Sequence, residues 1–243
     1  MSPYANQPMS NWPNITQNLI DSYPLKQSEI LEIAIIAWQQ VWDTVIGNQI
    51  SLQEFDLPAT IVGYFFQKLF ANELERKYPK QWRGELNKND KDLVYIENSH
   101  FSTEMKTSGQ MGYCLYGNRS YNQRVDRSLD TKDKSGFYIT LNFYHKRMTC
   151  LRIGWIDQDD WIPQSSQTGQ AATLKPEVYQ YKMQVIGGSY IKETPVAMLK
   201  GVGSTTLSLL EENKIFTFYD LKSYNGDNKK IIKLRDNNYE NLG

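Results

Sequence analysis

The segment 92–106 constrains the fold of this chain more than any other, because it has the pattern of a β-hairpin. Its first arm, Leu93 to Ile96, is apolar and rich in residues that favour strands. Asn98 and Ser99 supply turn chemistry, and Phe101 to Met105 forms the return arm. We therefore expect two adjacent antiparallel strands near the middle of the sequence.

Three charged residues fall on one face of this hairpin. A turn centred on Asn98 pairs Asp92 with Glu104, and alternation along the strand turns Lys106 to the same side. Asp90 shares a face with Asp92, so either acid could take part. The competing interpretation is a surface hairpin with solvated charges, because an acid two residues before a lysine occurs six times in this chain.

The residue types on this face suit divalent-metal chemistry. Mg²⁺ prefers hard oxygen ligands and keeps several waters, so one or two protein carboxylates are sufficient. Asp92 and Glu104 would hold the ion, which lowers the pKa of a water and offsets charge on a phosphate. Lys106 would orient the attacking water or help to deprotonate it. The hairpin therefore predicts a site that hydrolyses phosphodiester bonds.

This pattern resembles the motif of the PD-(D/E)xK nuclease superfamily, in which an Asp is followed, after a spacer, by Asp/Glu-x-Lys on adjacent strands. Here eleven residues separate Asp92 from Glu104-Met105-Lys106, and Lys91 stands where the motif has proline. The resemblance implies Asp92, Glu104 and Met105 as metal ligands and Lys106 as a catalytic residue.

In many members of that superfamily the helix before the hairpin adds a glutamate to the metal site. The sequence predicts such a helix from about Pro58 to Tyr78. Gln67 is the candidate within it, and Glu73 is the alternative. A solvated helix face would also explain both residues.

A second signal for nucleic-acid binding lies near the C-terminal end. Leu199-Lys-Gly-Val-Gly203, followed by an apolar-periodic helix, resembles a helix-hairpin-helix motif. Its glycines would allow a tight turn, and the N–H groups at the start of the next helix would hold a DNA phosphate. The candidate contacts are Lys200, Gly201, Gly203, Ser204 and Thr205. A glycine turn between two packing helices is the competing interpretation.

Composition limits the other classes of protein. Formal net charge is zero, which argues against coating nucleic acid by bulk electrostatics. Arg119, Arg124 and Arg127 nevertheless lie in one polar segment, and Arg119 and Arg124 are candidate DNA contacts. With Cys114 and Cys150 as the two cysteines, neither a disulfide scaffold nor a cysteine-based zinc site is expected. We expect a cytoplasmic protein without membrane segments.

The remaining sequence organises the chain around the hairpin. Helical periodicity starts at Ser28 after a loop-like beginning, and Gly136 to Tyr144 pairs with Met148 to Trp155 as strands. Residues 157–175 are expected to form a long polar loop. These elements predict an α/β fold, a mixed central sheet flanked by helices, with a small helical element after it. The expected divisions are a restriction-endonuclease-like catalytic domain at 1–190, a DNA-binding element at 191–224 and a polar tail at 225–243.

Together, these patterns predict a Mg²⁺-dependent type II restriction endonuclease that cleaves double-stranded DNA as a homodimer. This resemblance rests on the small size of the chain and its single catalytic hairpin. It rests also on the absence of motifs for ATP-driven or methyltransferase activity. Two alternatives stay open. One is a DNA-binding protein that uses the helix-hairpin-helix without catalysis, and the other is a structure-specific repair or junction nuclease.

Overall fold

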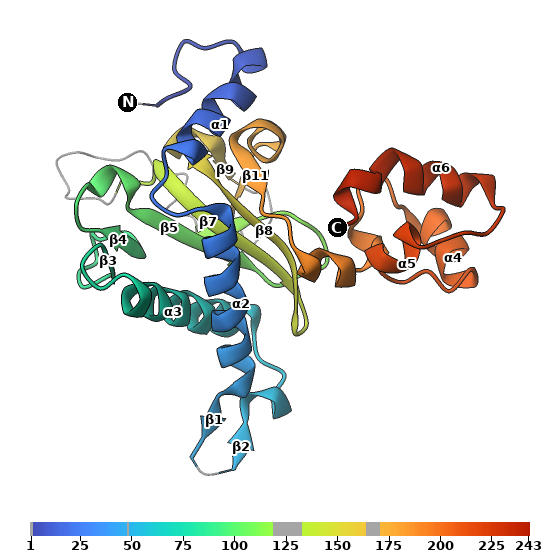
Figure 1. Ribbon diagram of the computed structural model, residues 1–243, viewed down its shortest axis with the longest axis horizontal. Coiled ribbons are helices and arrows are strands. Elements are labelled where there is room, and N and C mark those ends of the chain that lie inside the picture. The colour runs from blue at the N-terminus through green and yellow to red at the C-terminus, as the bar shows by residue number, and fades with distance from the viewer. Residues whose placement is uncertain (1, 48, 119–132, 164–170) are drawn as a thin grey trace.

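The computed structural model describes residues 2–47, 49–118, 133–163 and 171–243. Its α-helices there are α1 (Trp12–Asp21), α2 (Gln27–Asp43), α3 (Ala59–Lys77), α4 (Ser204–Glu212), α5 (Phe218–Lys222) and α6 (Lys229–Asn238). Its strands there are β1 (Val45–Ile46), β2 (Ile50–Ser51), β3 (Trp82–Gly84), β4 (Leu93–Tyr95), β5 (Thr103–Ser108), β6 (Tyr116–Asn118), β7 (Gly136–Tyr144), β8 (Arg147–Ile156), β9 (Trp161–Pro163), β10 (Ala171–Leu174) and β11 (Met183–Val185). Helices cover a central sheet, and a helical element lies to one side of it (Figure 1).

The central sheet has the strand order β11-β8-β7-β5-β4-β3. Strands β5 and β7 are parallel, and the other neighbouring pairs are antiparallel. The expected mixed α/β fold is thereby confirmed. Leu93 pairs with Thr103, so the next residues along the two strands, Asp92 and Glu104, stand opposite each other in the predicted register.

The connection inside the hairpin is longer than a tight turn. A 3-10 helix, Ser99–Phe101, joins β4 to β5, and the Asn98 side chain caps it by accepting a hydrogen bond from the backbone N–H of His100 at 3.0 Å. The return strand therefore starts at Thr103 rather than at Phe101.

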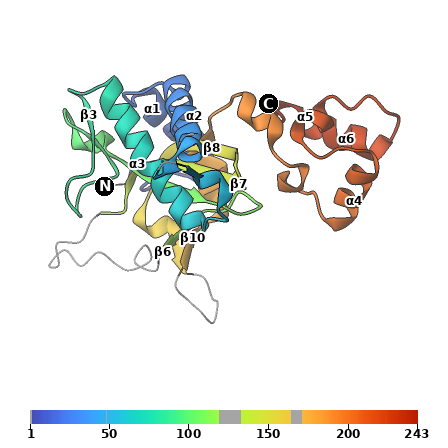
Figure 2. The ribbon, with the colours of Figure 1, turned by 90° about the horizontal axis from the view of Figure 1, so that it is seen from below.

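The two faces of the sheet pack against different layers. Phe137, Ile139 and Leu141 of β7 point into one core with α2 and α3, while Tyr138 points into another. The second core is completed by the small sheet β6-β10-β9, which lies across the central sheet from the two helices (Figure 2). Of the helices in the described ranges, none is long and apolar enough to cross a membrane.

Two segments are more ordered than the sequence predicts. The beginning of the chain contains α1, because Trp12, Ile15 and Leu19 recur at helical spacing among polar residues and pack on the main core. The expected loop at 157–175 contains β9 and β10. Trp161 and Leu174 are buried there, and this apolar burial explains why the flanks of a polar segment form strands.

The helical element at the C-terminal end has its own core, separate from the two cores of the sheet. The expectation of a frayed polar tail at 225–243 is wrong, because residues 229–238 form α6. Ile231 and Leu242 are buried in this third core, with Leu234 packed against it. Such a sparse apolar stripe is sufficient to hold a helix when a neighbouring surface covers it.

Helix α3 lies very close to β5 at Gly63. A Cβ atom there would lie 2.0 Å from Oγ1 of Thr107 on β5. We predict that Gly63→Ala lowers the free energy of unfolding by roughly 1–3 kcal/mol through overpacking, despite a gain of up to about 1 kcal/mol in helix propensity. Denaturant unfolding measures the loss. Adding Thr107→Ala should restore part of it, and the control Gly84→Ala, whose Cβ would lie 3.6 Å from Ala71, should be nearly neutral. Equal stability of Gly63→Ala and wild type would contradict the close contact.

Candidate active site

Strands β4 and β5 bring the three predicted charged residues together. Asp92 and Glu104 are buried, and the Asp92 carboxylate accepts a hydrogen bond from the backbone N–H of Met105 at 2.7 Å. Nζ of Lys106 lies 3.5 Å from Oε1 of Glu104. Two acids and a lysine thus lie together where the start of β4 meets β5.

Met105, between the two charged residues of β5, faces the other way. Its side chain is buried in the core beneath α2 and α3, so the thioether cannot reach the charged face. Its carbonyl oxygen accepts a hydrogen bond from Nζ of Lys106 at 3.0 Å. The backbone oxygen of Met105 is therefore the atom of this residue that belongs to the site.

A pocket of about 140 Å³ lies between Asp92 and α3. Gln67, Lys68, Ala71, Asn72 and Glu75 line it from the helix. Their spacing of three and four residues makes one continuous stripe, and this periodicity could have revealed the pocket-facing residues from the sequence. Glu75 is the acid that the sequence analysis missed.

The two alternative acids are engaged elsewhere. Glu73 lies off the stripe, and its Oε1 accepts hydrogen bonds from Gln40 of α2 at 2.7 Å and from Arg76 at 2.9 Å. Asp90 pairs with Arg83 at 2.8 Å and also accepts the backbone N–H of Leu86. Its role is therefore to hold the loop before β4.

A buried arginine braces the loop that follows the catalytic strand. Lys106, Thr140 and Arg152 stand side by side across β5, β7 and β8. The Arg152 guanidinium donates to Oδ1 of Asn142 at 2.7 Å and to the carbonyl of Tyr113 at 3.2 Å. Asn142 in turn donates to the carbonyl of Cys114 at 3.0 Å. These buried polar groups fix residues 112–114 beside the charged face.

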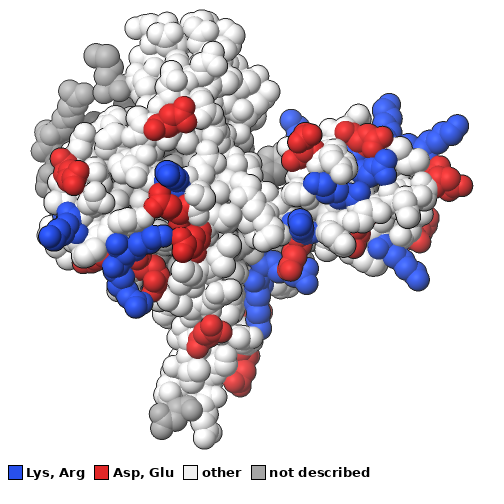
Figure 3. Space-filling model, in the orientation of Figure 1, with Lys and Arg blue, Asp and Glu red and all other residues white. Residues whose placement is uncertain are grey.

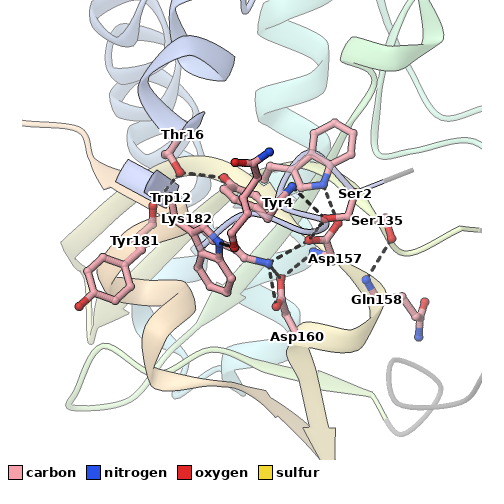
Figure 4. A network of polar contacts seen from close by, with 12 residues as sticks. Ser2, Tyr4, Trp12, Thr16, Ser135, Asp157, Gln158, Asp160, Tyr181 and Lys182 are labelled. Carbon is pink, nitrogen blue, oxygen red and sulfur yellow. Dashed lines mark hydrogen bonds and ion pairs between the residues drawn. The ribbon is translucent and has the colours of Figure 1, made fainter. Parts of the chain in front are cut away.

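A second cluster of two acids and a lysine lies at the far end of β8, and sequence reasoning did not find it (Figure 4). Nζ of Lys182 lies 2.9 Å from Asp157 and 2.8 Å from Asp160, and it sits over the rings of Tyr4 and Trp12 at 4.4 and 4.6 Å. Burial raises the pKa of Asp160, although Lys182 opposes this shift.

The carboxylates of this second cluster are saturated. Asp157 also accepts hydrogen bonds from the hydroxyl of Ser2 at 2.7 Å and from Nε1 of Trp155 at 2.9 Å, and Asp160 accepts the backbone N–H of Asp157 at 2.8 Å. The cluster therefore ties the beginning of the chain to the sheet, and its oxygens are committed to protein donors.

The predicted phosphate-binding turn precedes α4. Gly201 has φ +91°, which favours glycine, whereas Gly203 has φ −92° and a Cβ there would meet open space. The segment before the turn is a 3-10 helix, Val196–Met198, rather than an α-helix. Ser204 and Thr205 are the first residues of α4, and they follow Lys200 closely in the sequence.

A hollow of about 230 Å³ adjoins this turn. Gly201 and Thr206 line it together with Lys230 and Lys233, two cations from α6 that the sequence analysis missed. Their spacing of three residues on a capped helix was the available signal. Arg119, Arg124 and Arg127 lie outside the described residues.

Comparison with known proteins identifies the family. The model of the ScaI restriction endonuclease family matches residues 2–187, which include the whole charged face and α3. The chain belongs to the ScaI restriction endonuclease family. The curated type II restriction enzyme ScaI from Streptomyces caespitosus is 30% identical over 194 residues, a match that covers 76% of this chain and 84% of that enzyme. A solved restriction endonuclease in complex with substrate DNA matches 82% of this chain and 97% of its own, with a TM-score of 0.38 and 10% identity.

Membership of the ScaI restriction endonuclease family confirms the expected class of enzyme. The protein is a type II site-specific deoxyribonuclease, and DNA is its substrate. Enzymes of this type generally use divalent metal ions. The matched region ends at residue 187, so the C-terminal helical element lies beyond it.

Asp90 should contribute to stability rather than to cleavage. Its hydrogen bond with Arg83, followed by those from backbone N–H groups, lowers the pKa of Asp90 from 3.8 to about 2. We predict that Asp90→Asn lowers the free energy of unfolding at pH 7 by about 1 kcal/mol while cleavage persists. Because the folded-state pKa is depressed, the wild-type advantage is present above pH 4 and fades as the pH falls toward 2. Urea unfolding of both proteins between pH 7 and pH 3 measures it, and loss of cleavage with unchanged stability would reverse the assignment.

Proposed function

We propose that Asp92, Glu104, Lys106 and Gln67 form the catalytic site, and that this site cleaves both strands of DNA with Mg²⁺. The observation that carries the proposal is the register of β4 and β5, which places two buried carboxylates and a lysine on one face. The second acid–lysine cluster does not compete, because hydrogen bonds within the protein saturate its carboxylates.

The donor set fits a small hard cation. Carboxylate oxygens of Asp92 and Glu104 and the carbonyl oxygen of Met105 would hold it, with Gln67 or Glu75 approaching from α3. Within the described ranges no three His, Cys, Asp or Glu side chains form a metal cluster, so backbone, amide, water and phosphate oxygens would complete the shell. When bound, the ion would supply positive charge that offsets the charge developing on the scissile phosphate.

The protein residues divide the remaining work. The hydrogen bond from the backbone of Met105 fixes the orientation of the Asp92 carboxylate. Lys106, whose Nζ donates a hydrogen bond to the carbonyl of Met105, would orient the attacking water. Arg152 and Asn142 hold the neighbouring loop in place.

The C-terminal element would bind DNA independently of base sequence. Its turn at Lys200, Gly201 and Gly203 exposes backbone N–H groups at the start of α4, where Ser204 and Thr205 add hydroxyl donors. Lys230 and Lys233 bring positive charge to the adjoining hollow. Figure 3 shows Lys and Arg side chains over this element, interspersed with acidic ones.

We further propose the boundaries 1–190 and 191–224 for the catalytic domain and the DNA-binding element, with α6 extending the element beyond 224. The end of the family match at residue 187 and the separate third core support this division. A homodimer would supply two equivalent sites for two strands. The free thiols Cys114 and Cys150 fit the reducing cytoplasm.

The catalytic assignment predicts that Asp92→Asn, Glu104→Gln and Lys106→Met each reduce cleavage of mixed-sequence plasmid at least about 1,000-fold, because each removes a charge that acts at the reacting phosphate. DNA affinity should change little, since phosphate contacts elsewhere remain. Asp90→Asn and Glu73→Gln are the matched controls and should produce the wild-type pattern of discrete bands.

The same digests distinguish the metal. Mg²⁺ and Mn²⁺ should support cleavage, whereas the larger Ca²⁺ should permit binding with little turnover. Cleavage that survives exhaustive EDTA treatment, or full activity in all three charged-face variants, would refute the site.

The C-terminal proposal predicts a loss of affinity without a change in the sequence that is cut. Gly203→Val is accommodated in the free protein because open space surrounds the position, yet its side chain would block close approach of a phosphate. With Lys200→Ala, affinity should fall by similar factors for all duplexes, and the slope against salt should shrink by about one. Binding titrations over a salt series measure both effects. Unaltered binding would leave the turn as a packing element.

A further inference from the structure

An arm projects from the end of α2, away from the sheet (Figure 1). We define the arm as residues 44–47 and 49–56, which contain β1, β2 and the 3-10 helix Leu52–Glu54. Its root is firmly attached, because Leu52 is buried and donates its backbone N–H to the carbonyl of Thr44 at 3.0 Å. Nζ of Lys146, in the β7–β8 turn, also donates to the carbonyl of Gln53 at 3.1 Å.

The outer part of the arm is apolar and exposed. Val45 and Ile46 are each 52% exposed, Ile50 is 48% exposed and Phe55 is 45% exposed. Four large apolar side chains within eleven residues exceed the scattered exposure of an ordinary surface. A two-stranded ribbon of this kind is marginal in water on its own, so a second surface is needed to cover it.

The charge around the arm excludes the DNA backbone as that surface. Residues 27–67 contain no lysine or arginine, while Asp43, Glu54 and Asp56 lie in or beside the arm. The lower projection in Figure 3 accordingly shows acidic and uncharged residues. A polyanion would be repelled, and a protein surface with positive charge would be attracted.

Such a surface exists on this same chain. A hollow of about 720 Å³ lies between α2, the β7–β8 turn and the C-terminal element. Trp38, Tyr190 and Tyr219 give it aromatic walls. Its rim carries three cations, Lys146, Arg147 and Lys192, against one acid, Glu193, which lies 3.8 Å from Arg147. Aromatic walls with a cationic rim complement an apolar, acidic arm.

We propose that the arm of one copy docks into this hollow of a second copy, and that the exchange is reciprocal. Lys146 both lines the hollow and contacts the root of the arm in the same copy. A two-fold axis between two copies would therefore lay their arms side by side and antiparallel, so that the tip of each arm reaches the hollow beside the root of the other. The inference rests on the proposed homodimer and assigns the surface that forms it.

The mass of the protein in solution tests the assignment. Sedimentation of the wild type should give twice the 28.3 kDa chain mass. Val45→Asp with Ile50→Asp should raise the dimer dissociation constant at least about 100-fold, because two apolar contacts at the centre of the interface become charged. Val185→Asp is the matched control, since Val185 is also 52% exposed but lies on β11, and its dimer should persist.

A charge exchange then tests which surface the arm meets. Glu54→Lys/Asp56→Lys on the arm and Arg147→Glu/Lys192→Glu on the hollow should each give monomers. Mixing the two variants should restore a dimer, because both reciprocal contacts then join opposite charges. Three results would each overturn the proposal. They are a monomeric wild type, a dimer that persists in either double variant of the arm, and a mixture of the two charge variants that stays monomeric.

The outcome is separable from that of the catalytic site. Glu104→Gln should remain dimeric while losing cleavage, and the arm variant should lose the dimer while its charged face stays intact. An arm variant that is still a dimer but no longer binds DNA would show that the arm contacts DNA. That result would refute the docking of the arm into the hollow of the second copy.

Discussion

The proposed catalytic face is held together by a hydrogen bond from the backbone N–H of Met105 to the carboxylate of Asp92. The ladder between β4 and β5 is short. The Asp92 carboxylate adds one more hydrogen bond between the two segments, just before β4 begins. This hydrogen bond holds the acid at the start of β4 against the strand that carries Glu104 and Lys106. The same contact therefore serves the register of the sheet and the geometry of the site.

The two acid–lysine clusters show how environment separates structure from chemistry. Around Lys182, hydroxyl, indole and backbone donors satisfy both aspartates, and two aromatic rings cover the ammonium. Such a fully satisfied network rigidifies the junction between the N-terminal segment and β8. Around Glu104, Nζ of Lys106 stands 3.5 Å from the carboxylate and donates a hydrogen bond to the backbone carbonyl of Met105.

The sequence was most informative where interactions are local. Strand alternation and a turn centred on Asn98 were enough to place Asp92 opposite Glu104, and a helical stripe would have selected Gln67 and Glu75 over Glu73. The pairing of Lys182 with Asp157 could not be predicted, since it requires knowing that β11 lies beside β8. Helix α6 was missed because its core-facing residues, Ile231 and Leu234, are few among many charges, and tertiary packing rather than composition orders the helix.

The third core gives the C-terminal element a mechanical consequence. It joins the sheet through Tyr190 and through the hydrogen bond from Thr194 to the carbonyl of Thr149, so it is a short-tethered module rather than an extension of the main core. If the module binds DNA as proposed, a duplex held by either part would be presented to the other at high effective concentration, without any gain in the affinity of either surface. Weak contacts on the module would then lengthen residence on DNA while each contact remains individually easy to break, which is what an enzyme that must search a long polymer requires.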